Sequence, residues 1–388
     1  MSDSSRVRVS IVAESSYGTT PGSPAMLVLP ITGVSLKDRI GYQQSNVLNS
    51  SRDVEDLVRL DKSAGGGIPC ELRYSPSGGG LNLAIQSVLC STFSAAVTTG
   101  SCAITSGNNE ITRAAGSFVS DGYEVGDIIK VSDYSSGVEY RRLSSVAALT
   151  LGVEGEDFNA TDAAVTVTRG ARIKNGTTTP SFTVEVAYLD LQIAHIFTGV
   201  VFAQADLNVA VGQLATIGFS MEGKTSTRVD TNTGTTDQFI ASATYTAAAS
   251  HPSLDPVGVT EIQVGGSDYA ASSIAASWNN NVRGRQQLGA LGPQSMARGQ
   301  FAVSGRVTAY FDSFDDHDDY ADNVATDMWF VILDANSRGY SVSYPQAKFS
   351  DVENPVASNN SDIFKTLAVT AYKDPTEGCT VRLQRWGD

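Results

Sequence analysis

Short runs of alternating apolar and polar residues recur along the whole chain, and they constrain the fold more than any other feature. Near the N-terminus, Val7, Val9, Ile11 and Ala13 occupy alternate positions, with Arg8 and Ser10 between the first three. Because successive side chains of a strand point to opposite faces, such a run places one face of an extended segment in a core. Ser, Thr, Gly, Val and Ala are abundant, which suits many short strands joined by turns. We therefore predict an all-β protein with two short helices.

The first half of the chain predicts a sheet interrupted by one helix. Apolar residues from Leu81 to Leu89 fall at helical spacing after a Gly-rich turn, so we expect a helix there that lies across the sheet. Residues 37–56 contain few apolar anchors and are interpreted as a long exposed loop. The expected strands cover residues 6–13, 26–36, 68–74, 181–190, 195–205 and 214–222.

The second half runs through the same order of elements again. The two loops share lettering, Gly41-Tyr-Gln-Gln44 in one and Gly284-Arg-Gln-Gln287 in the other. We therefore predict two tandem β-sandwich or barrel units. The second unit is expected to contain a strand over 274–282, a polar loop over 283–297, a strand over 303–311, an acidic helix over 312–325, and strands over 328–333, 341–349 and 363–372.

The sequence pattern changes between residues 93 and 172. In this stretch, short expected strands such as 127–131 and 164–168 are separated by closely spaced turns. This stretch is interpreted as a small β-domain inserted into the first unit. The predicted division is residues 1–92 with 173–235 for the first unit, 93–172 for the insertion, and 236–388 for the second unit.

Catalytic and cofactor motifs are absent from the sequence. It has only three histidines, His195, His251 and His317, and it lacks a nucleophile elbow, a phosphate-binding loop and a zinc-binding helix motif. The four cysteines show no metal-ligand spacing and are expected to be reduced and mostly buried. We expect no enzyme activity, no catalytic residue, no metal and no cofactor.

Two charged clusters have alternative interpretations. Six aspartates between Asp312 and Asp322 offer oxygen ligands of the kind that calcium prefers, but they also suit the start of a helix, whose dipole attracts negative charge. Arg283, Arg285 and Arg298 could touch nucleic acid, although no aromatic residue interleaves them. In a chain with a formal net charge of -14, we favour pairing of these arginines with carboxylates of a neighbouring subunit.

Neither a membrane segment nor a secretory signal is expected. The N-terminus, Met1-Ser-Asp-Ser-Ser-Arg6, lacks the basic and apolar run of a signal peptide, and no apolar stretch has the length of a membrane helix. The sequence therefore predicts synthesis in a cytoplasm and no membrane partner.

Several segments resemble the tail tube proteins of long-tailed, non-contractile bacteriophages, and the resemblance covers most of the chain outside the insertion. They are Val9-Ser-Ile-Val-Ala-Glu-Ser-Ser-Tyr-Gly-Thr-Thr-Pro21, Asp53-Val-Glu-Asp-Leu-Val-Arg59, Gly218-Phe-Ser-Met-Glu-Gly-Lys224 and Arg306-Val-Thr-Ala-Tyr-Phe311. The resemblance implies a β-sandwich with a flanking helix, whose inner sheets join across subunits into a closed barrel. It also implies rings that stack into a tube in the virion after assembly in the host cytoplasm.

The resemblance suggests which residues touch the next ring. The candidates lie in the two polar loops and beside them: Tyr42, Gln43, Gln44, Asn49, Arg52, Arg285, Gln286, Gln287, Met296 and Arg298. Because two units in one chain would replace two subunits, a three-chain ring with pseudo-sixfold symmetry is favoured, and a six-chain ring is the second possibility.

The resemblance also implies the partners of such a ring. DNA and a tape measure protein would pass through a smooth, acidic lumen without specific binding, tail terminator and tail tip proteins would close the ends, and the insertion would decorate the exterior. The alternative from another class is a β-sandwich adhesin or receptor-binding module, but the loops here are polar and carry few aromatic residues.

Overall fold

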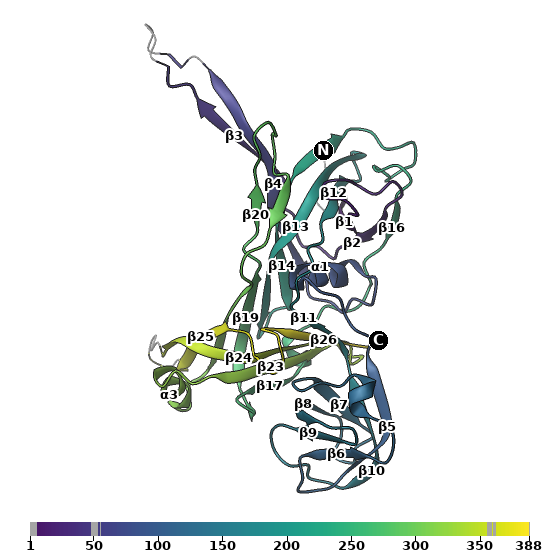
Figure 1. The fold of residues 1–388 in the computed structure, drawn as a ribbon, viewed down its shortest axis with the longest axis vertical. Helices are drawn as coiled ribbons and strands as arrows, with labels where there is room; N and C mark the ends of the chain where they lie inside the picture. The colour runs from purple at the N-terminus through teal and green to yellow at the C-terminus, as the bar shows by residue number, and fades with distance from the viewer. Residues whose placement is uncertain (1–5, 48–52, 55, 355–358, 360–361, 388) are drawn as a thin grey trace.

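The computed structural model describes residues 6–47, 53–54, 56–354, 359 and 362–387 (Figure 1). The protein is mostly β, with 51% strand and 7% helix, which confirms the predicted all-β class. The two expected helices are α1 (Gly80–Leu89) and α3 (Asp315–Ala321). The acidic helix is shorter than the predicted 312–325, and a one-turn helix, α2 (Phe118–Asp121), was not expected.

One antiparallel sheet, called here the open sheet, runs through both halves of the chain. In spatial order its strands are β4 (Leu57–Glu71), β14 (Thr216–Gly223), β13 (Ile193–Ala210), β19 (Ala271–Asn279), β22 (Ala302–Tyr310), β25 (Phe364–Ala371) and β24 (Gly339–Glu353).

A second layer covers one face of the open sheet, and two long strands bend from one layer into the other. The first part of β13 pairs with β12 (Phe182–Tyr188) and β15 (Thr225–Val229), and the first part of β24 pairs with β23 (Thr326–Leu333) and β26 (Arg382–Trp386). The layer also contains β1 (Val7–Ala13), β2 (Ala25–Val28), β11 (Ala171–Lys174), β16 (Thr244–Thr246), the 3-10 turn η2 (Pro256–Gly258), β17 (Val259–Val264) and β18 (Ser267–Asp268).

The main core fills the space between these layers. Trp278 of β19 donates a hydrogen bond from its indole Nε1 to the hydroxyl of Tyr344 on β24, over 3.2 Å, so the two layers meet through these side chains. Phe202 packs edge-on against Phe182 and Phe219, with ring centroids 5.3 and 5.5 Å apart. Helix α1 lies against β13 as predicted, because its apolar stripe is buried in this core.

The same strand order occurs twice in the chain. In the first half, β12, β13, β14 and β4 are successive antiparallel neighbours. In the second half, β23, β24, β25 and β22 pair in the same order. A helix follows β4 and another follows β22, so each half builds one four-strand unit with one helix.

A separate closed barrel is formed by β5 (Val97–Ile104), β6 (Glu110–Arg113), β7 (Ile128–Ser132), β8 (Glu139–Val146), β9 (Thr150–Val153) and β10 (Asp162–Arg169). It has its own core, in which Phe118 and Tyr123 pack edge-on. All six strands lie within residues 93–172, and the barrel lies beside the second layer, at the lower right of Figure 1. The division of the chain into domains stays a prediction.

Two segments expected to lack regular structure form strands. Residues 37–56 were predicted to be a loop, but β3 (Lys37–Gln44) pairs with β4 and the two strands project from the body as a long hairpin (Figure 1). The predicted loop 283–297 contains the short hairpin β20 (Arg283–Arg285) and β21 (Ser295–Ala297). Residues 225–229, which follow the predicted strand 214–222, form β15, because that segment pairs with the first part of β13.

Candidate functional site: the open face and the projecting hairpins

The outer face of the open sheet, called here the open face, carries small polar side chains. One row crosses all seven strands through directly paired residues: Pro69, Gly218, Asp206, Ser277, Ser304, Thr370 and Lys348. A neighbouring row contains Glu71, Thr216, Asn208, Ala275, Arg306, Ala368 and Asp351. Neither row contains an aromatic or a long aliphatic residue, so this face is smooth and rich in hydrogen-bonding groups.

Charge on these two rows is sparse and nearly balanced. Glu71, Asp206 and Asp351 oppose Arg306 and Lys348, so the two rows carry three acidic and two basic side chains. Hydrogen bonds from Ser253 and from Arg73 lower the pKa of Glu71, which keeps this carboxylate ionised and partnered. Asp206 accepts a 2.8 Å hydrogen bond from the amide of Gln204. Such a surface attracts a polyanion only weakly.

The barrel packs on the opposite side of the molecule from the open face. On β23, Met328, Phe330 and Ile332 point into the main core, whereas Trp329, Val331 and Leu333 point toward the barrel. These last three form a buried cluster with Ile128 and Tyr140 of the barrel and with Trp386 of β26. Because the second layer separates the barrel from the core, the open sheet and the barrel form the two outer sides of the molecule.

A buried ionic network also joins the barrel to the body. Arg142 of β8 is ion-paired with Glu154 of the barrel and with Glu377 of the body. Arg382 of β26, which is fully buried, lies 3.0 Å from Glu377 and 3.3 Å from Asp127. Buried charges are tolerated only when they are paired, so this network fixes the two parts to each other.

Glu154, a member of this network, has a raised pKa. Burial raises the pKa of Glu154 to about 7, and the nearby Asp327 and Glu377 carboxylates add to the rise, although Arg142 opposes it. Glu154 Oε2 and Asp327 Oδ2 are buried without a hydrogen-bond partner. Arg142 lies near three carboxylates, of which Glu377 also pairs with Arg382, so protonation of Glu154 would reduce the negative charge around the guanidinium.

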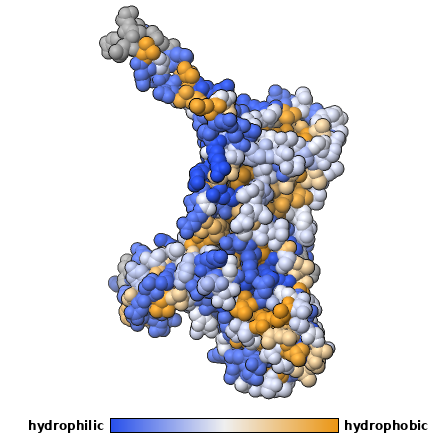
Figure 2. Space-filling model, in the orientation of Figure 1, coloured by the Kyte–Doolittle hydropathy of each residue, from blue (hydrophilic) through white to orange (hydrophobic). Residues whose placement is uncertain are grey.

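The β3–β4 hairpin exposes apolar side chains far from the core. Tyr42, Leu57 and Leu60 are 56%, 59% and 56% exposed, and Ile40 and Val58 are also exposed. Figure 2 shows hydrophobic surface along this projection, beside hydrophilic residues. An isolated two-stranded projection with this much exposed apolar surface is typical of an interaction surface.

A polar cluster fixes the base of this hairpin. Asp38 of β3 accepts a hydrogen bond from Ser226 and lies 3.9 Å from Lys62 and 3.7 Å from Arg228. His195 Nε2 is 2.7 Å from Ser226 Oγ, and burial lowers the pKa of this histidine. The contacts connect β3 and β4 to β13 and β15, so they set the direction in which the hairpin leaves the body.

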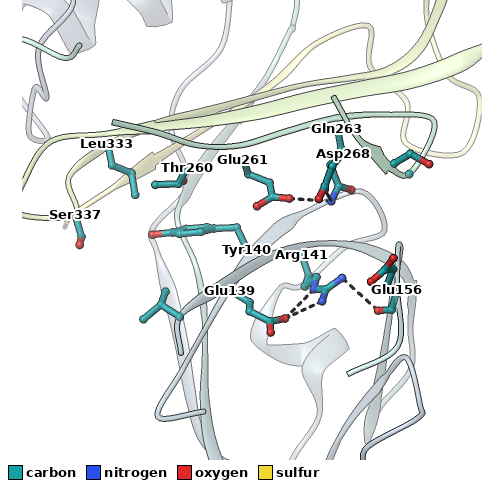
Figure 3. A pocket seen from close by; sticks show the side chains of 13 residues that line it. Glu139, Tyr140, Arg141, Glu156, Thr260, Glu261, Gln263, Asp268, Leu333 and Ser337 are labelled. Carbon is teal, nitrogen blue, oxygen red and sulfur yellow. Dashed lines mark hydrogen bonds and ion pairs between the residues drawn. The ribbon is translucent and has the colours of Figure 1, made fainter. Parts of the chain in front are cut away.

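The cavity between the barrel and the β17–β18 hairpin has a volume of about 580 Å³. Several polar side chains contact one another along its walls (Figure 3): Arg141 is 2.8 Å from Glu139, and Gln263 donates hydrogen bonds to Glu261 and Asp268. The lining contains no histidine or cysteine. This cavity therefore offers no nucleophile with an adjacent imidazole base.

A family model described as phage tail tube protein matches residues 4–371. The chain belongs to the phage tail tube protein family. It is a structural component of the phage tail, located in the virion, and the family is not enzymatic. Members of this family self-assemble into the tube. The family therefore supports a tail tube protein and not the alternative, an adhesin or receptor-binding module. No curated protein sequence matches the chain significantly.

Several of the side chains considered for catalysis or metal binding in this tail tube protein have structural partners. Ser226 lies between His195 and Asp38, whereas a nucleophilic triad requires the histidine in the middle. Lys365 binds Asp312 and Asp316 at 2.8 and 2.6 Å and so fixes α3. Within the described ranges no group of three or more potential ligands is positioned for a metal ion, and none of the helices there could cross a membrane.

Most of the predicted ring-contact residues of the tail tube protein lie on the two projections. Tyr42, Gln43 and Gln44 end β3, and all three are exposed. Arg285, Gln286 and Gln287 are exposed on the β20–β21 hairpin, where Leu288 is fully exposed. Asn49 and Arg52 lie outside the described residues.

Two of the predicted contact residues sit deeper than the rest. Met296 and Arg298 are half-buried, and Arg298 donates a 3.0 Å hydrogen bond to the carbonyl of Pro180. The structure also places Leu57, Leu60 and Leu288 beside the predicted residues. These leucines were not predicted as contact residues, because the sequence alone does not distinguish an exposed leucine from a buried one.

Proposed function

We propose that three chains form one ring of the tube, that the open face lines the lumen, and that the tube belongs to a long, non-contractile tail. The observation that carries the proposal is the repeated four-strand unit in one continuous sheet. Two units per chain supply six units from three chains, which gives a ring with pseudo-sixfold symmetry. Closure of the sheet around the ring removes its free edges.

The proposed lumen wall suits the passage of DNA and of a tape measure protein without specific binding. A double helix slides easily only where the wall does not hold its phosphates. The open face supports this role through small neutral side chains rather than through a high density of acid, since its two central rows carry only three acidic and two basic residues. Most of the net charge of -14 must therefore lie on other surfaces.

The proposed position of the barrel is the tube exterior. If the open face lines the lumen, the barrel must point outward, because it packs on the other side of the second layer. A contractile sheath would have to wrap this outer surface closely, and a protruding barrel on each chain would obstruct it. This supports assignment of the tube to a non-contractile tail and keeps the insertion, residues 93–172, as a domain of its own.

The two projections are proposed to contact the next ring. The β3–β4 hairpin offers exposed apolar side chains, and the segment 283–298 carries three arginines and no acidic residue. Stacking through such projections is head-to-tail, so the two ends of a tube differ. Tail terminator and tail tip proteins are proposed to bind these different ends.

Native mass spectrometry of rings released from tubes tests the ring size. We expect a mass of three chains, about 122 kDa from the 40.8 kDa chain. A six-chain mass would overturn the pseudo-sixfold ring and support the second possibility. Negative-stain electron microscopy of the same sample should show hollow rings or tubes, and class averages of the rings should show six similar lobes on the inner wall.

A further inference from the structure

The chain contains a joint between two four-strand units. Within the open sheet, the strand of the first unit that borders the second unit is β13, which pairs with β19 from Gln204↔Asn279 to Ala210↔Ser273. On its other side β19 pairs with β22, the first long strand of the second unit. Along the chain β19 comes just before the β20–β21 hairpin and so leads into the four strands of the second unit.

The first unit has an equivalent of β19 at the opposite edge of the sheet. Residues 31–36 precede the β3–β4 hairpin and run antiparallel to β4, with a bridge between Ile31 and Cys70 and hydrogen bonds from Thr32 and Ser35 to β4 carbonyls. Ile31, Val34 and Leu36 are only partly buried against the main core. In the described part of the chain, no strand pairs with the outer side of this segment.

The second unit has an equivalent of β13 at the other edge. In β24, residues 348–353 pair with β25 on one side, whereas β23 reaches only Ala347 on the other. Among the described residues no strand continues along that second side. The open sheet therefore ends in two free edges, and each edge lacks the neighbour that its counterpart has inside the chain.

The two helices support this comparison independently. α1 packs on β13 and β19, and Ile85, Val88 and Leu89 are buried there. The side chain of Asn280, which follows β19, donates a 2.8 Å hydrogen bond to the carbonyl of Val88. α3 packs on β24 in the same way, but the residues around it, Phe314, Tyr320 and Val324, are 61%, 40% and 43% exposed.

We propose that residues 348–353 of β24 pair with residues 31–36 of a second copy of this chain, reproducing the β13–β19 joint between subunits. The inference rests on the proposed tube and names the edges that close its ring. The strand directions fit, because β24 follows the direction of β13, and residues 31–36 follow that of β19. Adding a strand to an open edge satisfies backbone groups on both sides.

Cysteine pairs across the proposed joint provide the test. Asp351→Cys is combined with Ser35→Cys in one variant and with Thr32→Cys in another, to allow for the register. Paired residues of antiparallel strands have Cα atoms about 4.5–5.5 Å apart, within the range of a disulfide. The four native cysteines are buried. After oxidation of assembled tubes, we expect one pair to move most of the protein into a disulfide-closed species of three chains.

A matched control uses Asp351→Cys with Ser304→Cys, both on the open face but two strands apart within the chain. It should stay monomeric on a non-reducing gel. Tubes that are intact by microscopy but give no cross-link with either joint pair would overturn the proposed edges. A ladder ending at six chains would support the edges and overturn the three-chain ring. Failure of the wild-type chain to form rings or tubes would count against the proposed function itself.

A second variant tests the same joint without new disulfides. Val34→Lys places a charge on a partly buried edge residue that the neighbouring strand should cover. We expect the purified chain to keep its melting temperature within a few degrees and to lose rings and tubes. Val138→Lys on the exposed barrel surface is the control and should assemble normally. Normal assembly of Val34→Lys would contradict the proposal.

Discussion

Arg142 connects the barrel to the body of the protein, although it belongs to a barrel strand. Its guanidinium is almost fully buried and contacts carboxylates from two parts of the chain, Glu154 in the barrel and Glu377 in the body. Removal of one member of a buried ion pair leaves the remaining charges without compensation. The arginine therefore couples the stability of the barrel to that of the sheet.

Replacement of Arg142 by methionine keeps much of the side-chain volume and removes the charge. We expect the free energy of unfolding to fall by about 3–5 kcal/mol, the usual cost of breaking a buried pair. Urea unfolding followed by tryptophan fluorescence measures it, because Trp329 and Trp386 lie at this junction. The control is Arg39→Met, whose pair with Glu222 is exposed and should cost under about 1 kcal/mol. Equal losses in the two variants would argue against the structural role of the network.

Glu154 should make stability depend on pH. Its pKa in the folded protein is about 7, above the ordinary value of 4.5, so the folded state holds the proton more tightly than the unfolded state. The resulting stabilisation is complete below about pH 4.5 and is lost as the pH rises through 7. Between pH 5 and 8, the melting temperature of the wild type should fall more steeply than that of Glu154→Gln. Parallel curves would show that another group sets the pH dependence.

At the scale of elements, the β3–β4 hairpin should matter for assembly and little for folding. Its exposed apolar residues make few contacts with the core, so Tyr42→Ser, Leu57→Ser and Leu60→Ser together should leave the melting temperature nearly unchanged. We expect rings to form but tubes to be lost, as seen by negative-stain microscopy. Val119→Ser with Val138→Ser removes exposed apolar residues from the barrel and serves as the control. Tubes of normal length in the hairpin variant would contradict its role in stacking.

The sequence predicts elements well where one face is buried. The helix at 81–89 and the strands at 6–13 and 303–311 agree with α1, β1 and β22, because burial of one face imposes a period on the residues. The β3–β4 hairpin was missed for the same reason. Much of it projects into solvent, so neither face of β3 is buried. Residues such as Arg39, Gly41 and Gln43 therefore give this segment the polar composition of a loop.

The candidate site was harder to predict than the core. The open face consists of residues that are common in turns and strands alike, such as Ser277, Ser304 and Thr370. Only the pairing register, which depends on contacts between distant parts of the chain, aligns them into one row. The predicted division into a repeated unit followed the order of elements along the chain, and the strand pairings have that same order in both halves.

At the scale of the whole molecule, the charge of the lumen wall should control DNA movement. Asp206→Lys changes one residue at the centre of the open face, and a three-chain ring would repeat it in every layer of the tube. We expect slower DNA ejection, with the delay reduced at high salt, because new cations hold phosphates and salt screens them. Asp157→Lys on the exposed barrel is the control. Unchanged ejection kinetics for Asp206→Lys would contradict the assignment of this face to the lumen.

The barrel interrupts only one of the two units that each chain carries. A tube built from identical subunits of one unit each would carry either six such barrels on every ring or none. In the proposed three-chain ring, the inner wall would keep sixfold pseudosymmetry while the outer surface would have threefold symmetry, with one barrel every 120°. In such a ring, two units in one chain would give the lumen a different symmetry from the tube exterior, so each surface could change without the other.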